Sequence, residues 1–208
     1  MIQYSSIPHL KDAKILNQKV YSFYKYDGSN LRFEWQPKKG FCKFGSRTQM
    51  IDEKTEIFGK AIPLFQETMS KEVIERITDF YGKKVMNSCE RVVVFAEFFG
   101  KNSFAGNHEE SDEKQLKIFD INMYKKGILP PQEFIKIFND YENSAELLYY
   151  GNLNQEYISS VNLNIDNKLE EGVICKSIIK NQVHMTKVKT HQWIDRLKGK
   201  FTDWEHRL

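Results

Sequence analysis

One lysine in the segment Lys25-Tyr26-Asp27-Gly28-Ser29-Asn30 has the neighbours that covalent chemistry requires. The amine of Lys25 becomes a nucleophile when its proton is removed, and Gly28 allows a phosphate group to approach the backbone closely. The same segment is compatible with a hairpin turn that carries a solvated lysine, because Asp-Gly is a common hairpin turn. The other charged residues of the chain must therefore decide between a reactive and a solvated Lys25.

Four further features carry charges that can act together with this lysine. They are Arg47 after Gly45-Ser46, Glu97 inside an apolar run, Glu171 before Gly172, and the pair Lys187 and Lys189. Lys187 and Lys189 occupy alternate positions of a predicted strand, so their side chains share one face. Each feature also has a structural interpretation, such as a surface arginine, a turn, or charges that protect an edge strand. Glu97 is harder to explain in this way, because an acid in a buried strand must be paired or functional.

Together these side chains describe a site for a nucleoside triphosphate. Two lysines and an arginine would neutralise the phosphates, and the carboxylates would bind Mg²⁺ or Mn²⁺ or accept a hydrogen bond from a ribose hydroxyl. Lys25 needs a lowered pKa to attack phosphorus, and nearby cations at Lys187 and Lys189 act in that direction. The predicted product is a lysine–nucleotide phosphoramidate, with pyrophosphate as the leaving group.

The elements that position these residues alternate irregularly between strands and helices. Strands are predicted on both sides of the Lys25 segment within 20–35, and at 41–44, 91–99, 116–124, 171–178 and 182–189. Helical periodicity is present in 63–81, from 131, in 155–161 and from about 191, and a loop is predicted over 101–114. The near-continuous apolar run at 91–99 indicates a strand buried on both faces. This pattern favours an α+β fold with mainly antiparallel sheets flanked by helices.

Length and composition limit the class of protein. The 208 residues are 40% hydrophobic and 13% aromatic, which indicates a globular chain with a substantial core. A formal net charge of +3 is mildly favourable for a polyanionic partner and does not identify one. Three widely spaced cysteines predict neither a disulfide framework nor a zinc site. With no apolar stretch of membrane-spanning length and no signal pattern, we expect a cytoplasmic protein with no membrane partner.

In their order along the chain, these features resemble the covalent nucleotidyltransferases, which are the polynucleotide ligases and the mRNA capping enzymes. The resemblance extends from about Lys25 to Lys189 and implies that Lys25 is the nucleotidyl-accepting lysine. The other implied roles are ATP or AMP binding by Tyr24, Asn30 and Arg47, ribose contact by Glu97, purine stacking by Phe119, metal binding by Glu171, and α-phosphate contact by Lys187 and Lys189. The nucleotide is expected in a cleft between the sheets.

Within this group the sequence resembles the RNA ligases of the bacteriophage RNA ligase 2 type and the RNA-editing ligases. Ser29-Asn30 is similar to their K-x-x-G-S/T/A-N pattern, whereas DNA ligases usually have an arginine at the position of Asn30. Phe119-Asp120-Ile121 is also similar to the RNA ligase version. The resemblance implies RNA repair by self-adenylation with ATP, transfer of AMP to a 5′-phosphate at an RNA end or nick, and attack by a 3′-hydroxyl.

Alternatives to this reading stay open. A minimal ATP-dependent DNA ligase would use the same lysyl-AMP chemistry, a capping enzyme would use GTP, and a binding module would have lost catalysis. We expect a single adenylyltransferase domain over residues 1–208, without a separate C-terminal OB-fold or helical domain, because only about twenty residues follow Lys189. The chain would then be a minimal ligase or a fragment, or a partner protein or second copy would replace the missing domain.

Overall fold

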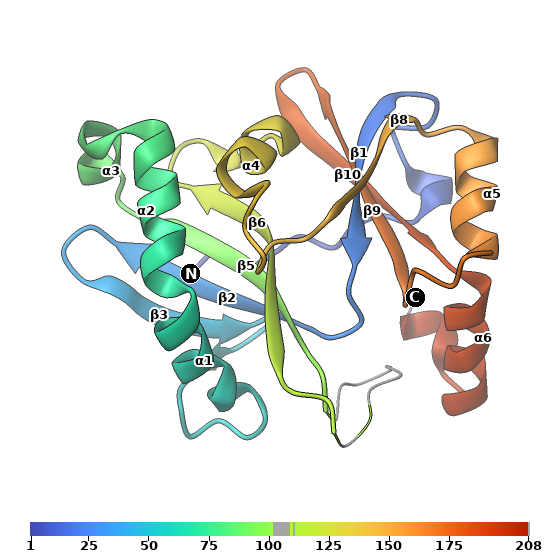
Figure 1. Cartoon of the computed structure of the whole chain (residues 1–208), viewed down its shortest axis with the longest axis horizontal. Coiled ribbons are helices and arrows are strands. Elements are labelled where there is room, and N and C mark those ends of the chain that lie inside the picture. The colour runs from blue at the N-terminus through green and yellow to red at the C-terminus, as the bar shows by residue number, and fades with distance from the viewer. Residues whose placement is uncertain (102–108, 110, 208) are drawn as a thin grey trace. The chain divides into compact units, whose positions relative to one another are not determined.

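The computed structural model describes residues 1–101, 109 and 111–207, and in this part the chain forms two compact units. The first unit consists of Met1–Ser5, Ser29–Phe99 and Glu113–Ser144, and the second of Ser6–Gly28, Gly100–Asp112 and Ala145–Leu208. Each unit contains one sheet with antiparallel strand pairing and its own helices (Figure 1). The predicted α+β class with antiparallel sheets is confirmed, and the extent of a single domain over 1–208 stays a prediction.

The sheet of the first unit is built around a strand that is buried on both faces. Its strands are β2 (Ser29–Gln36), β3 (Gly40–Ser46), β4 (Met50–Ile51), β5 (Val92–Phe99), β6 (Gln115–Met123) and β7 (Gly127–Ile128). They are arranged in the order β4-β3-β2-β5-β6-β7. Every residue of β5 except Glu97 is buried, so the apolar run at 91–99 marks the central strand, as predicted.

The helices of the first unit are α1 (Ala61–Thr68), α2 (Ser70–Tyr81), α3 (Lys83–Ser88) and α4 (Pro131–Phe138). The helical pattern over 63–81 is divided into two helices, because Met69 has a φ of −131° that does not fit a helix. Gly82 ends α2 with a φ of 86°, which glycine adopts without a steric penalty. Phe65 of α1 stacks on Phe33 of β2 with ring centroids 4.0 Å apart, so α1 packs directly on the sheet.

The second unit has a four-stranded sheet covered by helices. Its elements are β1 (Lys19–Lys25), β8 (Leu147–Asn152), β9 (Gly172–Ile179), β10 (Gln182–Lys189), α5 (Gln155–Leu163) and α6 (His191–Lys200). The strand order is β10-β9-β1-β8. Helix α5 packs against β9 and β10, and α6 lies beside α5 (Figure 1). The core between sheet and helix contains Ile15, Val20, Leu153, Ile158, Val161, Val173, Cys175 and Val188.

Two features of this unit differ from simple readings of the sequence. The pattern analysis predicts no strand at β8, because this edge strand has only exposed and half-buried side chains and therefore lacks a buried apolar period. The Lys25 segment is not a hairpin turn. Strand β1 pairs with β8 and β9, whereas β2 pairs with β3 and β5, so residues 26–28 connect strands of different sheets.

Candidate active site

The register of three strands brings two of the predicted site lysines to the same end of one sheet. Lys25, the last residue of β1, is opposite Gly172 of β9, and Gly172 is opposite Lys189 of β10 on its other side. Residues paired across neighbouring strands direct their side chains to the same face of a sheet. Lys25 and Lys189 therefore flank the beginning of β9, although they are 164 positions apart in the sequence.

Glu171 binds both lysines through its two carboxylate oxygens. Lys25 Nζ donates a hydrogen bond to Glu171 Oε2, and Lys189 Nζ lies 2.7 Å from Glu171 Oε1. Glu171 and Lys189 are buried, and Lys25 is partly accessible. The cluster has two cations and one anion, and its excess positive charge suits a phosphate group.

Burial and mutual charge interactions shift the pKa values in this cluster. Burial alone would raise the pKa of Glu171, but the charges of Lys25 and Lys189 outweigh it and hold the pKa below its usual value. Burial lowers the pKa of Lys189 to about 8, and the nearby charge of Lys25 acts in the same direction. Glu171 opposes this decrease without cancelling it. Glu171 is therefore a carboxylate at neutral pH, and Lys189 is an unusually acidic ammonium.

The backbone at position 172 requires a glycine directly after Glu171. Its φ of +148° is rarely adopted by residues with a side chain, and a Cβ at this position would lie 2.1 Å from the carbonyl oxygen of Val188. The amide of Thr190 donates a hydrogen bond of 3.0 Å to the carbonyl of Glu171. The close approach of β9 to β10 therefore needs glycine, and it places Glu171 beside Lys189.

Lys187 shares its strand with Lys189 and has the alternate position predicted from the sequence. Lys187 is half-buried and lies opposite Ile174 of β9. Its backbone also forms an isolated parallel β-bridge with His9, near the beginning of the chain. Burial lowers the pKa of His9, and the charges of Lys187 and Lys189 lower it further. The face of β10 that carries both lysines is therefore an environment of positive charge.

Tyr24, which we also predict to bind the nucleotide, points away from the face that carries Lys25, because adjacent strand residues alternate in direction. Its hydroxyl oxygen accepts a hydrogen bond of 3.0 Å from the amide of Glu170, and its ring centroid is 4.6 Å from that of Tyr26. Burial raises the pKa of Tyr24 to about 12. Tyr24 thus packs beneath the site, and its contact with a nucleotide stays a prediction.

The remaining predicted residues belong to the first unit. Asn30 of β2 is directly opposite Glu97 of β5, so the register makes two predicted ligand contacts neighbours. Among the described residues, none provides a hydrogen-bond partner for Asn30 Oδ1, which is buried. Glu97 is half-buried, whereas every other residue of β5 is buried. Arg47 follows β3 directly and is exposed.

Phe119 of β6 is held in a group of aromatic rings. Tyr4 makes an edge contact with Phe119 at 5.1 Å between centroids, and Phe95 lies 6.4 Å from it in a stacked orientation. The Tyr4 hydroxyl donates a hydrogen bond to Asp120, and burial together with this carboxylate raises the pKa of Tyr4. The sequence patterns did not indicate Tyr4, because nothing near it is periodic.

Trp193 of α6 was also missed by the sequence analysis. Its Nε1 donates a hydrogen bond of 3.0 Å to Asp27 Oδ2, and its ring centroid lies 3.6 Å from Lys189 Nζ. Thr190 at the N-cap position of α6 is a recognisable helix-start signal three residues earlier. That signal predicts a helix and does not predict what the helix contacts.

Within the described residues, the candidate ligands for a metal ion are single carboxylates. In this part of the chain, no group of three or more His, Cys, Asp or Glu side chains is arranged to hold a metal ion. His108 and Glu110 of the predicted polar loop lie outside the described residues. A lone carboxylate such as Glu171 fits Mg²⁺ or Mn²⁺, since Mg²⁺ is commonly held by one or two carboxylates together with substrate phosphates and water. No helix in the described ranges is long and apolar enough to cross a bilayer.

Comparisons with known proteins identify a family and a similar fold. The sequence profile of the family described as RNA ligase matches residues 18–190. No curated protein sequence matches the chain. A Naegleria gruberi RNA ligase, in an apo mutant form, is similar with a TM-score of 0.69 and 15% identity over 96% of this chain and 59% of that one. Two mutant forms of Naegleria gruberi RNA ligase, one with ATP and Mn and one with AMP and Mn, have TM-scores of 0.66 at 17% and 16% identity, with the same coverage. The chain thus spans about 59% of the length of these ligases, and the likeness shows the fold.

Proposed function

Because this chain belongs to the RNA ligase family, we propose that it is an ATP-dependent RNA ligase that forms a covalent lysyl-AMP on Lys25. The observation that carries this proposal is the position of Lys25 Nζ, which shares the buried carboxylate of Glu171 with a second ammonium from Lys189. A partly accessible amine beside a buried cation is suited to attack a phosphate that the cation holds. A solvated surface lysine would lack both the carboxylate and the second cation.

In the proposed first step, Lys25 Nζ attacks the α-phosphorus of ATP. A nitrogen–phosphorus bond forms, the bond from this phosphorus to the bridging oxygen breaks, and pyrophosphate leaves with the electron pair. The amine has to release its proton before or during attack, and Glu171 orients it by accepting its hydrogen bond. Lys189, with Lys187 two residues before it, would stabilise the negative charge on the α-phosphate.

We propose Mg²⁺ or Mn²⁺ as the metal, held on the protein side by Glu171. Such a cation would neutralise phosphate charge when bound. The Naegleria structures with ATP and Mn, and with AMP and Mn, support a nucleotide together with a divalent metal in this fold. Both Glu171 oxygens contact lysines, so one of these ion pairs would have to open or share its oxygen when the metal binds.

We further propose that Asn30, Arg47, Glu97 and Phe119 contact ATP, as the family resemblance implies. The buried Asn30 Oδ1 supports this for Asn30, because a buried acceptor without a partner among the described residues is suited to a donor from a ligand. Asn30→Ala should therefore raise the ATP concentration needed for half-maximal adenylation. Gln36→Ala on the same strand, outside the proposed contacts, should leave that concentration unchanged.

The later steps, AMP transfer to the 5′-phosphate of an RNA end or nick and attack by a 3′-hydroxyl, follow from the same proposal. A minimal DNA ligase is distinguished by comparing nicked duplexes whose 3′-hydroxyl ends are RNA or DNA, since sealing DNA ends as fast as RNA ends would favour the DNA ligase. We propose that the reaction takes place in the cytoplasm.

The decisive experiment is incubation of the protein with α-labelled ATP and Mg²⁺ or Mn²⁺. We expect label on the wild-type chain, no label on Lys25→Ala, and normal labelling of Lys19→Ala, which removes an exposed lysine from the other end of β1. Labelled GTP in place of ATP should give no adduct. An adduct with GTP would instead identify a capping enzyme. Label that persists in Lys25→Ala would contradict the proposal.

A further inference from the structure

We infer that Trp193 is a positioning residue for nucleotidyl transfer, because one side chain holds both the ammonium of Lys189 and the segment that follows Lys25. This inference rests on the proposed function. Residue 193 lies three positions beyond the end of the family match at residue 190. The role therefore belongs to helix α6 of this chain, outside the matched region.

The first contact is between the indole ring and Lys189. The ammonium lies 3.6 Å from the ring centroid, a cation–π arrangement, while its contact with Glu171 Oε1 is 2.7 Å long. Trp193 and Lys189 are both buried, so water does not screen this interaction. A lysine side chain has a flexible stem with many rotamers, and the ring and the carboxylate together restrict where its charge can lie.

The second contact is between the indole and Asp27. Trp193 Nε1 donates a hydrogen bond of 3.0 Å to Asp27 Oδ2, and both groups are buried. Indole has one donor, and that donor is directed at the acid two residues after Lys25. A movement of the ring would therefore change the segment that carries Lys25 and the position of Lys189 together.

The backbone fixes where α6 begins, and so where the ring lies. The Thr190 amide donates to the carbonyl of Glu171 at 3.0 Å, and the Trp193 amide donates to Thr190 Oγ1 at 3.1 Å. One turn later, Arg196 Nη2 donates to the carbonyl of Glu170 at 3.2 Å. The same backbone that presents the carboxylate of Glu171 therefore also holds the helix that presents Trp193.

Packing alone does not account for these contacts. Trp193 also forms a small apolar core with Leu197, against which Ile194, Phe201 and Trp204 pack. A purely structural tryptophan would need this core and an acceptor for its buried N–H, but it would not need a site ammonium over its ring. Leu197 is equally buried in the same core and helix, which makes Leu197→Ala a matched control for loss of packing.

The test measures the rate constant of lysyl-AMP formation at saturating ATP, and the half-saturating ATP concentration, for the folded fraction of each variant. We expect Trp193→Leu to lower the rate constant by about 100-fold, the scale of a 1 Å misplacement, with little change in the ATP concentration. Trp193→Phe keeps a ring beneath Lys189 and loses the hydrogen bond to Asp27, so its rate constant should lie between those of wild type and Trp193→Leu. Leu197→Ala should lower the melting temperature and keep the wild-type rate constant.

The outcomes separate this inference from the proposed function. A wild-type chain that never incorporates AMP would overturn both, whereas normal labelling by Trp193→Leu at the wild-type rate would overturn only the role of Trp193. Equal slowing by Leu197→Ala and Trp193→Leu in folded protein would reduce that role to packing and would also overturn it. If Trp193→Leu does not fold, Trp193→Phe provides the test. A wild-type rate constant in Trp193→Phe would show that the hydrogen bond to Asp27 does not contribute to the rate, and would overturn that part of the inference.

Discussion

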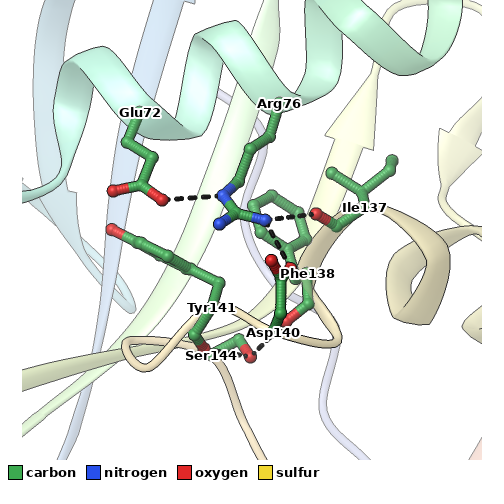
Figure 2. A network of polar contacts seen from close by, with 7 residues as sticks. All are labelled: Glu72, Arg76, Ile137, Phe138, Asp140, Tyr141 and Ser144. Atoms are coloured by element: carbon green, nitrogen blue, oxygen red, sulfur yellow. Dashed lines mark hydrogen bonds and ion pairs between the residues drawn. The ribbon is translucent and has the colours of Figure 1, made fainter.

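In two clusters of the described residues, one charged side chain forms ion pairs with two side chains of the opposite charge. In the second unit, the anion Glu171 lies between two lysines. In the first unit, the cation Arg76 on α2 lies between two carboxylates, and Figure 2 shows its guanidinium directed at both. The Arg76 cluster holds elements together, whereas the Glu171 cluster is the one that we propose takes part in the reaction.

Burial is the difference. The side chains of Glu72 and Asp140 are 49% and 78% exposed, so water screens their attraction to Arg76. The side chains of Glu171 and Lys189 are 5% and 8% exposed, so both charges have lost most of their hydration. Their attraction to each other, or to a bound ligand, has to compensate for this loss.

The Arg76 cluster connects elements of one unit. Arg76 Nη1 also donates to the carbonyl of Ile137 at 3.3 Å, and its guanidinium carbon lies 5.1 Å from the ring centroid of Tyr141 (Figure 2). These contacts join α2 to the end of α4 and the turn after it. A hydrogen bond with Asp140 raises the pKa of Arg76 above its ordinary value, so the guanidinium stays charged.

The largest expected effect is from Glu171→Gln. Removing the carboxylate leaves two lysines close together without their anion, and breaking a buried ion pair in this way lowers the free energy of unfolding by about 3–5 kcal/mol. Glu72→Gln is the matched change in the exposed cluster and should lower it by about 0.3–0.5 kcal/mol. Urea unfolding at pH 7 measures both, and equal losses would remove the distinction between the clusters.

A second prediction concerns the glycine that holds the buried cluster together. Gly172→Ala places a methyl group 2.1 Å from the carbonyl oxygen of Val188 and should destabilise the fold by about 1–3 kcal/mol, or more if the strands cannot separate. Gly199→Ala in helix α6 is the control, because an added Cβ there would meet no described atom within 4 Å apart from its chain neighbours and the backbone of its own helix. That change should stabilise the protein by about 0.5–1 kcal/mol. Thermal unfolding of both variants tests the sign of each effect.

The third prediction is a contribution to the pH dependence of stability that comes from Lys189 in the buried cluster and that the Arg76 cluster lacks. The pKa of Lys189 is about 8 in the folded protein and near its ordinary value of 10.5 in the unfolded chain. Between these values the unfolded chain binds more protons, so the free energy of unfolding should rise with pH by up to about 1.4 kcal/mol per unit.

Urea midpoints at pH 7.5, 8.5 and 9.5 measure this slope. Lys189→Met, which cannot titrate, should be flatter than wild type, whereas Arg76→Met should keep the wild-type slope. A slope that is the same in wild type and Lys189→Met would contradict the assignment.

Apart from the control changes, the smallest expected effect is from Arg76→Ala. It removes two exposed ion pairs and the contact with Tyr141, and we expect a loss of about 1 kcal/mol in the free energy of unfolding. The rate constant of lysyl-AMP formation in the folded protein should not change. A large fall in that rate constant would mean that the exposed cluster also takes part in the reaction.

The structure shows which parts of the site the sequence pattern could predict. The alternate spacing of Lys187 and Lys189 already requires a common strand face, and the glycine after Glu171 already suggests a constrained backbone. Neither pattern contains the register of β1 against β9. Pairing of Lys25 with Gly172 is a contact between residues 147 positions apart, and local periodicity carries no information about such pairs.

The misses have a common cause. The pattern over 63–81 was predicted from its helical period, whereas the break at Met69 is a backbone conformation that this period does not contain. Strand β8 has no buried apolar period, so only its pairing with β1 identifies it. Trp193 looks like any buried aromatic residue of a short helix until Lys189 and Asp27 lie beside it.

By itself, the sequence determined the α+β class, the lysine with the nucleophile pattern, and the family to which the chain is related. The class and the nucleophile pattern depend on residue type and local spacing, and the family resemblance depends on the order of short motifs from Lys25 to Lys189. The tertiary structure decided that Lys25 and Lys189 share one buried carboxylate, and that a tryptophan of the last α-helix lies against the second lysine. Charges interact through space over a few ångströms, so their partners and pKa values exist only once strand register and burial are fixed.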